Sequence, residues 1–144
     1  MRLDPEHARK LLACIDPGRV RSGQAVGLRD GALLALVAAG LSAVEIAALR
    51  ASAITTTNGK LLVSVRRHRL AWFVVLPIDL GGHLIAWLTE CRLWAVPEPV
   101  FQGSRGPLTA IGICKVLERY RNLHPVPVRR RPKFPLKRKS DVDL

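Results

Sequence analysis

Aromatic residues and cysteines are scarce in this chain of 144 residues. Aromatic residues make up 5% of the sequence, so aliphatic side chains must fill most of the core. The cysteines Cys14, Cys91 and Cys114 form no close pair and are odd in number, which argues against a disulfide framework and a zinc site. We expect them to be small buried thiols. With no Gly-rich phosphate loop and no CxxC motif, the sequence predicts no metal and no cofactor.

The sequence also lacks an apolar run long enough to span a bilayer. The longest, GALLALVAAGLSAV, stops at Glu45 and is typical of a buried helix. The amino-terminal segment MRLDPEHARK has no apolar core of the kind that a signal peptide requires. We therefore expect a cytoplasmic or nucleoid-associated protein without a membrane partner.

Acidic residues are too few to balance the basic ones. The chain has 23 Lys and Arg against 11 Asp and Glu, a formal net charge of +12. Like charges at this density repel one another and do not stabilise a compact domain, so the excess of basic residues indicates an anionic partner. Nucleic acid is the first candidate for that partner, and an acidic membrane surface is the second. The membrane is the weaker alternative, because no basic stretch alternates with apolar residues. Seven basic residues and no acidic one lie in positions 129–139.

We expect one domain over residues 1–128 and a disordered basic tail over residues 129–144 that binds nucleic acid. A remnant of a truncated or frameshifted gene is the alternative interpretation of the tail. Apolar periodicity predicts helices over residues 3–15, 28–40, 43–50, 78–94 and 110–121. Gly40 fits a left-handed helix end, Ser42 and Glu45 have the spacing of a capping box, and Thr109 fits an amino-terminal cap. The predicted core positions on these helices are Leu11, Leu12, Ile15, Leu84, Trp87, Leu88, Cys91, Ile113, Val116, Leu117 and Tyr120, with Val44 or Ile46 from the third helix.

From Ile54 onward the apolar residues recur at about every second position, which is typical of β-strands. The segment TTTNGKLLVSV contains an Asn58–Gly59 turn signal, and AWFVVLP is a second apolar strand, so we expect three antiparallel strands. The uninterrupted apolar run over 71–76 favours a strand covered on both faces. Trp72, Trp87 and Trp94 are expected in the core. The predicted fold class is α+β, mainly helical, with helices packed around a small three-stranded antiparallel sheet.

The order of these elements resembles that of the catalytic domain of tyrosine recombinases, the phage integrase family. LDPEHARKLLACI is similar to the family's opening helix, and GLRDGALLALVAAGLSAVEIAALRASAI to its buried helix, Gly-Leu corner and Glu-bearing helix. LLVSVRRHRLAWFVVLP resembles the hairpin that carries the active-site lysine. VFQGSRGPLTAIGICKVLERY is similar to the segment before the second catalytic box. The resemblance covers about residues 3–130 and implies a recombinase-like fold.

The resemblance also implies chemistry for which this chain lacks the residues. The family stabilises a phosphorane-like transition state with two arginines, a lysine and two histidines, while a tyrosine attacks the DNA phosphate. The first arginine belongs directly after the Gly-Leu pair, where this chain has a serine. The hairpin lysine falls near an arginine, which keeps the charge but is a poor proton donor. Aligning the second box, His-x-x-Arg-His, on Pro125 matches only its arginine. The degenerate positions are Ser42, Arg67, Val126, Arg129 and Arg130.

These losses predict a catalytically inactive, recombinase-like DNA-binding protein of mobile-element or phage origin that modulates integration or recombination. Tyr120, the sole tyrosine, lies on an apolar stripe and is expected in the core or at its edge. The alternatives are a split recombinase completed in trans by a partner's tyrosine and a protein-interaction module without DNA binding. The expected partners are double-stranded DNA, an active recombinase and a second copy of the chain. The predicted DNA-binding residues are Arg66, Arg67, Arg69, Lys115, Arg119, Arg129, Arg130 and Arg131.

Overall fold

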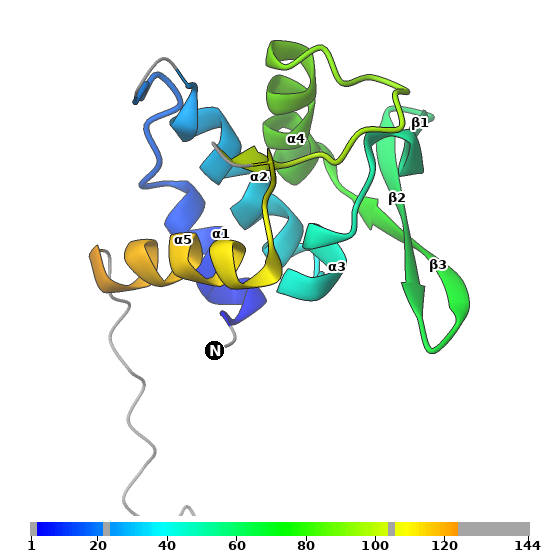
Figure 1. Ribbon diagram of the computed structural model, residues 1–144, viewed down its shortest axis with the longest axis horizontal. Coiled ribbons are helices and arrows are strands. Elements are labelled where there is room, and N and C mark those ends of the chain that lie inside the picture. Colours follow the sequence, from blue (N-terminus) through cyan, green and yellow to red (C-terminus); the bar gives the residue numbers. More distant parts are fainter. Residues whose placement is uncertain (1–2, 22–23, 104–105, 124–144) are drawn as a thin grey trace, which may run out of the picture.

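A computed structural model describes residues 3–21, 24–103 and 106–123. These residues form an α+β fold of five α-helices and a three-stranded antiparallel sheet, with a further two-residue β-pair (Figure 1). The elements are α1 (Pro5–Leu12), α2 (Val26–Ala38), α3 (Ala43–Ala47), the single-turn 3-10 helix η1 (Ala51–Ala53), β1 (Ile54–Thr57), β2 (Lys60–Arg67), β3 (Leu70–Leu76), α4 (Ile78–Glu90), β4 (Gln102–Gly103), β5 (Gly106–Pro107) and α5 (Ala110–Leu123). The predicted tail, residues 129–144, lies outside the described residues.

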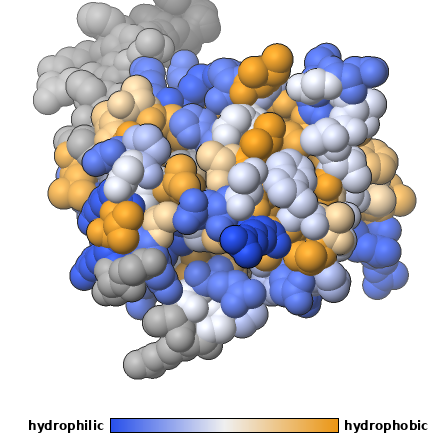
Figure 2. All heavy atoms as spheres, turned by 90° about the horizontal axis from the view of Figure 1, so that it is seen from above, coloured by the Kyte–Doolittle hydropathy of each residue, from blue (hydrophilic) through white to orange (hydrophobic). Residues whose placement is uncertain are grey.

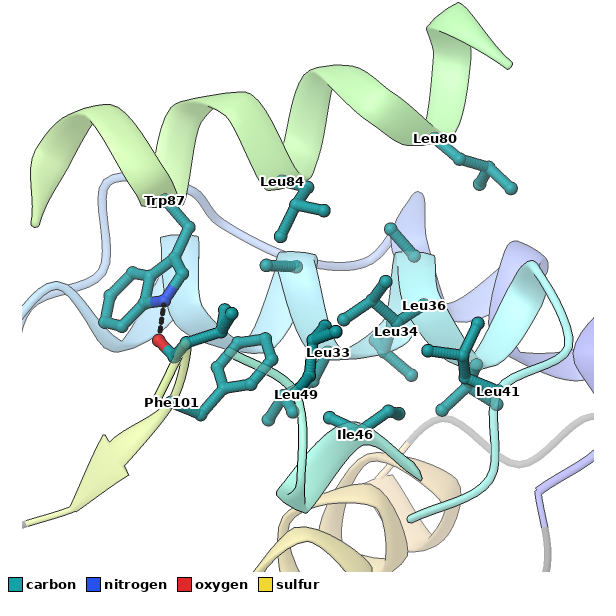
Figure 3. Close-up of a cluster of buried hydrophobic side chains, with 14 of the residues drawn as sticks. Leu33, Leu34, Leu36, Leu41, Ile46, Leu49, Leu80, Leu84, Trp87 and Phe101 are labelled. Atoms are coloured by element: carbon teal, nitrogen blue, oxygen red, sulfur yellow. Dashed lines mark hydrogen bonds between the residues drawn. The ribbon is translucent and has the colours of Figure 1, made fainter. Parts of the chain in front are cut away.

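Helix α2 is the centre of the core, with α1 and α4 packed against it. Leu33, Leu34 and Leu36 of α2 are completely buried, as their almost continuously apolar segment predicts. Trp87 of α4 donates a hydrogen bond from Nε1 to the carbonyl oxygen of Val100 at 2.8 Å, which satisfies its one polar atom inside the core. Figure 3 shows the converging side chains of this core, among them Leu33, Leu34, Leu36, Leu41, Ile46, Leu49, Leu80, Leu84, Trp87 and Phe101.

The corner between α2 and α3 follows its local sequence signals. Gly40 has a φ of +102°, and the Leu41 amide donates to the Leu36 carbonyl at 3.0 Å, so the helix ends at the predicted glycine. Ser42 then caps α3 through the predicted capping box with Glu45. Thr109 likewise caps α5, because its Oγ1 accepts a hydrogen bond from the Gly112 amide at 3.1 Å. These caps confirm the expected starts of both helices.

The sheet has the order β1-β2-β3, and each neighbouring pair is antiparallel. Leu61, Val63 and Val65 alternate along β2 and are buried, which places one face of this strand against the core. The β2–β3 hairpin turns at His68 and Arg69, which both have positive φ angles. In Figure 1 the tip of this hairpin points away from the helices. The basic tip is therefore presented at the periphery of the fold.

The prediction that both faces of the last strand are covered is wrong. Trp72 and Phe73 are 52% and 67% exposed, and Val75 is 48% exposed. The reason is topological: β3 is an edge strand of a small sheet, and most of its length extends beyond the helices that bury β2. Trp94, 38% exposed in the loop after α4, also lies outside the core, so Trp87 is the one tryptophan that is buried.

The prediction of three buried cysteines is also wrong, and Cys114 on α5 is only partly buried. Cys14 and Cys91 are exposed, because α1 and α4 end before they can carry these residues onto their buried faces. Cys91 is the residue that ends α4 instead of a member of its core stripe. Of the two alternatives on α3, Ile46 is the buried residue and Val44 is 69% exposed. Within the described ranges, no helix is both long and apolar enough to cross a membrane.

Candidate nucleic-acid interface

A basic hollow lies between the loop that precedes α2, the first turns of α2 and the exposed side of α5. Its volume is about 470 Å³. Lys115 and Arg119 of α5, both predicted from the sequence to bind DNA, line it together with three arginines that the sequence did not single out. We call this surface the basic hollow and define it by Arg19, Arg21, Arg29, Lys115 and Arg119.

The floor of the basic hollow contains the single buried acidic residue of the described chain, Asp30, which is 4% exposed. Its Oδ2 accepts a hydrogen bond from the Tyr120 hydroxyl at 2.5 Å. Its Oδ1 accepts from Nε of Arg29 at 2.9 Å and lies 2.8 Å from the NH2 nitrogen of the same residue. The carboxylate is thus fully engaged inside the fold and neutralises one arginine. No ion pair within the described ranges compensates Arg19, Arg21, Lys115 or Arg119.

Tyr120 is a structural residue of this floor. It is 7% exposed and sits on the buried stripe of α5, as the sequence predicts. Burial, and then the hydrogen bond to Asp30, raise its pKa well above the ordinary value for a phenol, while the charges of Arg19 and Arg29 oppose that rise. The hydroxyl therefore stays protonated at neutral pH and its lone pairs are poorly nucleophilic.

Sequence patterns missed Arg19, Arg21 and Arg29 for a definite reason. Arg19 and Arg21 lie in a polar loop between two helices, where charged residues are ordinary, and Arg29 is adjacent to an acid. Only the packing of α5 beside the start of α2 brings them next to Lys115 and Arg119. The one available signal is the pair of arginines in RVRSGQA, the stretch of sequence before α2, which has no acidic residue.

The hairpin tip, residues 66–69, carries the other predicted DNA-binding arginines within the described chain. Arg67 binds Glu45 through Nε to Oε2 at 2.6 Å and through NH2 to Oε1 at 3.1 Å, and it donates to the Gly40 carbonyl oxygen at 3.2 Å. Its charge is therefore used to hold the hairpin against the α2–α3 corner. Arg66 and Arg69 are exposed, and among the described residues neither has an ion-pair partner. The side chains of Arg66 and Arg69 are therefore available to bind an anion.

The structure brings together Ser42 and Arg67, two of the positions that the sequence comparison predicted to correspond to catalytic residues of the recombinases. Ser42 Oγ accepts from the Glu45 amide at 3.2 Å, its own amide donates to Glu45 Oε1 at 3.0 Å, and Glu45 carries the ion pair with Arg67. Glu45 thus joins the corner to the hairpin. Ser42 serves as a helix cap, so its hydroxyl lone pair is already engaged. The remaining predicted positions, Val126, Arg129, Arg130 and Arg131, lie outside the described residues.

Glu45 has a pKa below its ordinary value of 4.5. The hydrogen bonds from Arg67 are the largest cause, burial opposes them, and the bonds from Ser42 add to the lowering. A carboxyl whose pKa is lowered on folding stabilises the native state above its unfolded pKa. That stabilisation is lost as the pH falls through the folded value.

We expect Glu45→Gln to lower the free energy of unfolding by about 1 kcal/mol at neutral pH, because it removes the charge from both the capping box and the ion pair. The difference from the native protein should shrink as the pH falls below 4.5, where the unfolded chain binds a proton at Glu45, and should vanish once the pH is below the lowered pKa of the folded carboxyl. Denaturant unfolding measured across this range checks the prediction, with exposed Glu118→Gln as the matched control. Equal stability of Glu45→Gln and the native protein at neutral pH would contradict it.

No protein-family model matches the chain, and a search of curated proteins finds no significant match. The fold and the basic hollow therefore carry the functional argument.

Proposed function

We propose that this protein binds double-stranded DNA through the phosphates, with the basic hollow as the main contact surface and the hairpin tip as a second one. It would do so on a frame that resembles the catalytic domain of tyrosine recombinases, without their strand-cleaving chemistry. In this proposal it is of phage or mobile-element origin, and it modulates integration or recombination by occupying DNA or by associating with an active recombinase.

The single observation that carries the proposal is the charge balance of the basic hollow. Five basic side chains line one concavity, and Asp30, the only acid among the described residues of its lining, is buried and already bonded to Arg29 and Tyr120. Clustered cations without counter-charges repel one another, and an anion with several charged oxygens relieves that repulsion. A phosphate backbone supplies such oxygens at regular intervals. Arg66 and Arg69 at the hairpin tip would add contacts outside the hollow.

The alternative that this protein is half of a split recombinase rests on the sequence match of Arg129 to the arginine of the family's second catalytic box. A partner would have to supply the nucleophile, because Tyr120 is buried and bonded to Asp30. A nicked suicide substrate, incubated with the protein and a candidate recombinase, distinguishes the two proposals. A covalent adduct between the DNA and the partner recombinase that forms only when this chain is present would support the split enzyme, and non-covalent binding alone would support the DNA-binding protein.

DNA affinity measured over a series of salt concentrations tests the proposed function. Each phosphate neutralised by a cation contributes about −0.9 to the slope of log affinity against log salt. The four uncompensated cations of the basic hollow together with Arg66 and Arg69, one phosphate each, therefore predict a slope of about −5 for a duplex of arbitrary sequence. A flat dependence, or no binding, would overturn the proposal and favour a protein-interaction module.

Figure 2 shows hydrophilic and hydrophobic side chains intermixed on the face seen from above, with no large uniform apolar patch there.

A further inference from the structure

The free edge of β3 is the most apolar exposed segment of the sheet. Its sequence, LAWFVVL, contains no charged residue, no proline and no glycine. Leu70 is 61% exposed, and Trp72, Phe73 and Val75 are between 48% and 67% exposed. Natural proteins usually protect an edge strand with charges, proline, a bulge or short length, because its unpaired amide and carbonyl groups accept another strand.

The opposite edge of the same sheet is protected in this way. Strand β1 has four residues, three of which are the exposed threonines Thr55, Thr56 and Thr57. Strand β3 has seven residues, and its pairing with β2 is continuous from Leu70 to Leu76 without a bulge. Only one of the two edges is therefore long, regular and apolar, which is the arrangement of a strand that pairs with something outside the described fold.

We propose that β3 pairs antiparallel with β3 of a second copy of this chain, so that two three-stranded sheets become one six-stranded sheet across a two-fold axis at Phe73. The strand is self-complementary about its central residue. Phe73 faces Phe73 of the other copy, Ala71 faces Val75, and Trp72 faces Val74. Every cross-strand pair is apolar on both faces, and such pairs, aromatic ones above all, stabilise antiparallel sheets.

Charge favours a second copy in the antiparallel direction. The strand itself is neutral in a protein with a net charge of +12, so two copies can meet along it without like charges directly opposite each other. Arg69 precedes the strand and Pro77 follows it, while Asp79 lies in the first turn of α4 and is already paired with Arg9. Antiparallel pairing keeps the Arg69 side chains of the two copies at opposite ends of the interface, whereas parallel pairing places them together. An acidic partner protein would find no cation along the strand to recognise.

The expected interface is small, because one strand edge and four to five side chains are covered in each copy. Interfaces of this size are at the low end of the range for specific complexes, which predicts a dissociation constant of about 1–100 μM. Since the driving force is apolar, salt should strengthen the dimer by screening the repulsion between two cationic copies. DNA binding has the opposite salt dependence. The dimer is therefore tested without DNA and independently of the proposed function.

A charge-swap experiment at the two-fold axis tests the proposal. Phe73→Lys and Phe73→Glu each place two like charges opposite one another, so each variant alone should be monomeric, with self-association weakened by about tenfold or more. An equimolar mixture should form a heterodimer at moderate salt, because the opposite charges then face each other. Sedimentation equilibrium measures both, and circular dichroism verifies that each variant is folded. Ile111→Lys, at a 70% exposed position on α5, is the control and should dimerise as the native protein does.

Each outcome of this experiment either supports or contradicts the proposed pairing. A native dimer, two monomeric variants and a heterodimer in the mixture would establish the β3 pairing. A native protein that is monomeric up to millimolar concentration would overturn the proposal and leave the strand to a different partner. Native-like dimerisation of both Phe73 variants would place the interface elsewhere, and a mixture that stays monomeric would exclude the axis at Phe73.

Discussion

The variant Lys115→Glu/Arg119→Glu is expected to bind duplex DNA about 100-fold more weakly than the native protein at physiological salt. Both side chains lie on the exposed side of α5 and line the basic hollow, and neither has an ion-pair partner in the described ranges. Reversal removes two phosphate contacts and adds two repulsive charges beside the remaining arginines. Because both residues are exposed, the stability of the fold should change by no more than about 0.5 kcal/mol.

A matched control separates this local effect from the effect of net charge. Lys10→Glu/Lys60→Glu changes the formal charge by the same amount, and neither residue lines the basic hollow. We expect this control to weaken binding by less than about tenfold, through the long-range field alone. Fluorescence anisotropy with one labelled duplex measures both variants under identical conditions. Equal losses in the two variants would show that the hollow is not the contact surface.

The second large effect concerns stability. Asp30→Ala is expected to lower the free energy of unfolding by about 3–5 kcal/mol, because it leaves the Tyr120 hydroxyl and the Arg29 guanidinium without their buried acceptor. Tyr120→Phe should cost less, about 1.5–3 kcal/mol, since Asp30 keeps its ion pair with Arg29. Chemical denaturation of the two single variants and of the double variant measures the coupling between the residues. A loss below about 1 kcal/mol in Asp30→Ala would contradict the structural role of this floor.

Local signals explain which parts of the fold could be predicted from the sequence. The α2–α3 corner depends on Gly40, Ser42 and Glu45, which act on backbone groups within a few residues of themselves. The turns of the sheet and the buried stripe of α5 likewise follow from short patterns. Helix ends were less accurate: α4 stops at Glu90 although apolar periodicity continues, so Cys91 leaves the core.

The features that the sequence did not predict depend on contacts between distant segments. The basic hollow exists because α5 packs next to the beginning of α2, some ninety positions earlier, as the Tyr120–Asp30 hydrogen bond across a separation of 90 residues shows. The exposure of β3 depends on which strand lies at the edge of the sheet, and apolar composition alone cannot distinguish an edge strand from a central one. The structural role of Arg67, which the sequence predicted only as a DNA-binding residue, was missed for the same reason: its ion pair with Glu45 spans 22 residues.

Site-specific photo-cross-linking tests most directly whether DNA lies in the basic hollow. Leu123 lines the hollow and is 67% exposed, so replacing it by p-benzoylphenylalanine keeps every cation in place. Ile78, 77% exposed at the start of α4 and outside the hollow, is the matched control position. The proposal predicts that irradiation links position 123 to a duplex and leaves position 78 largely unlinked. Equal yields from the two positions, or cross-links from position 78 alone, would contradict it.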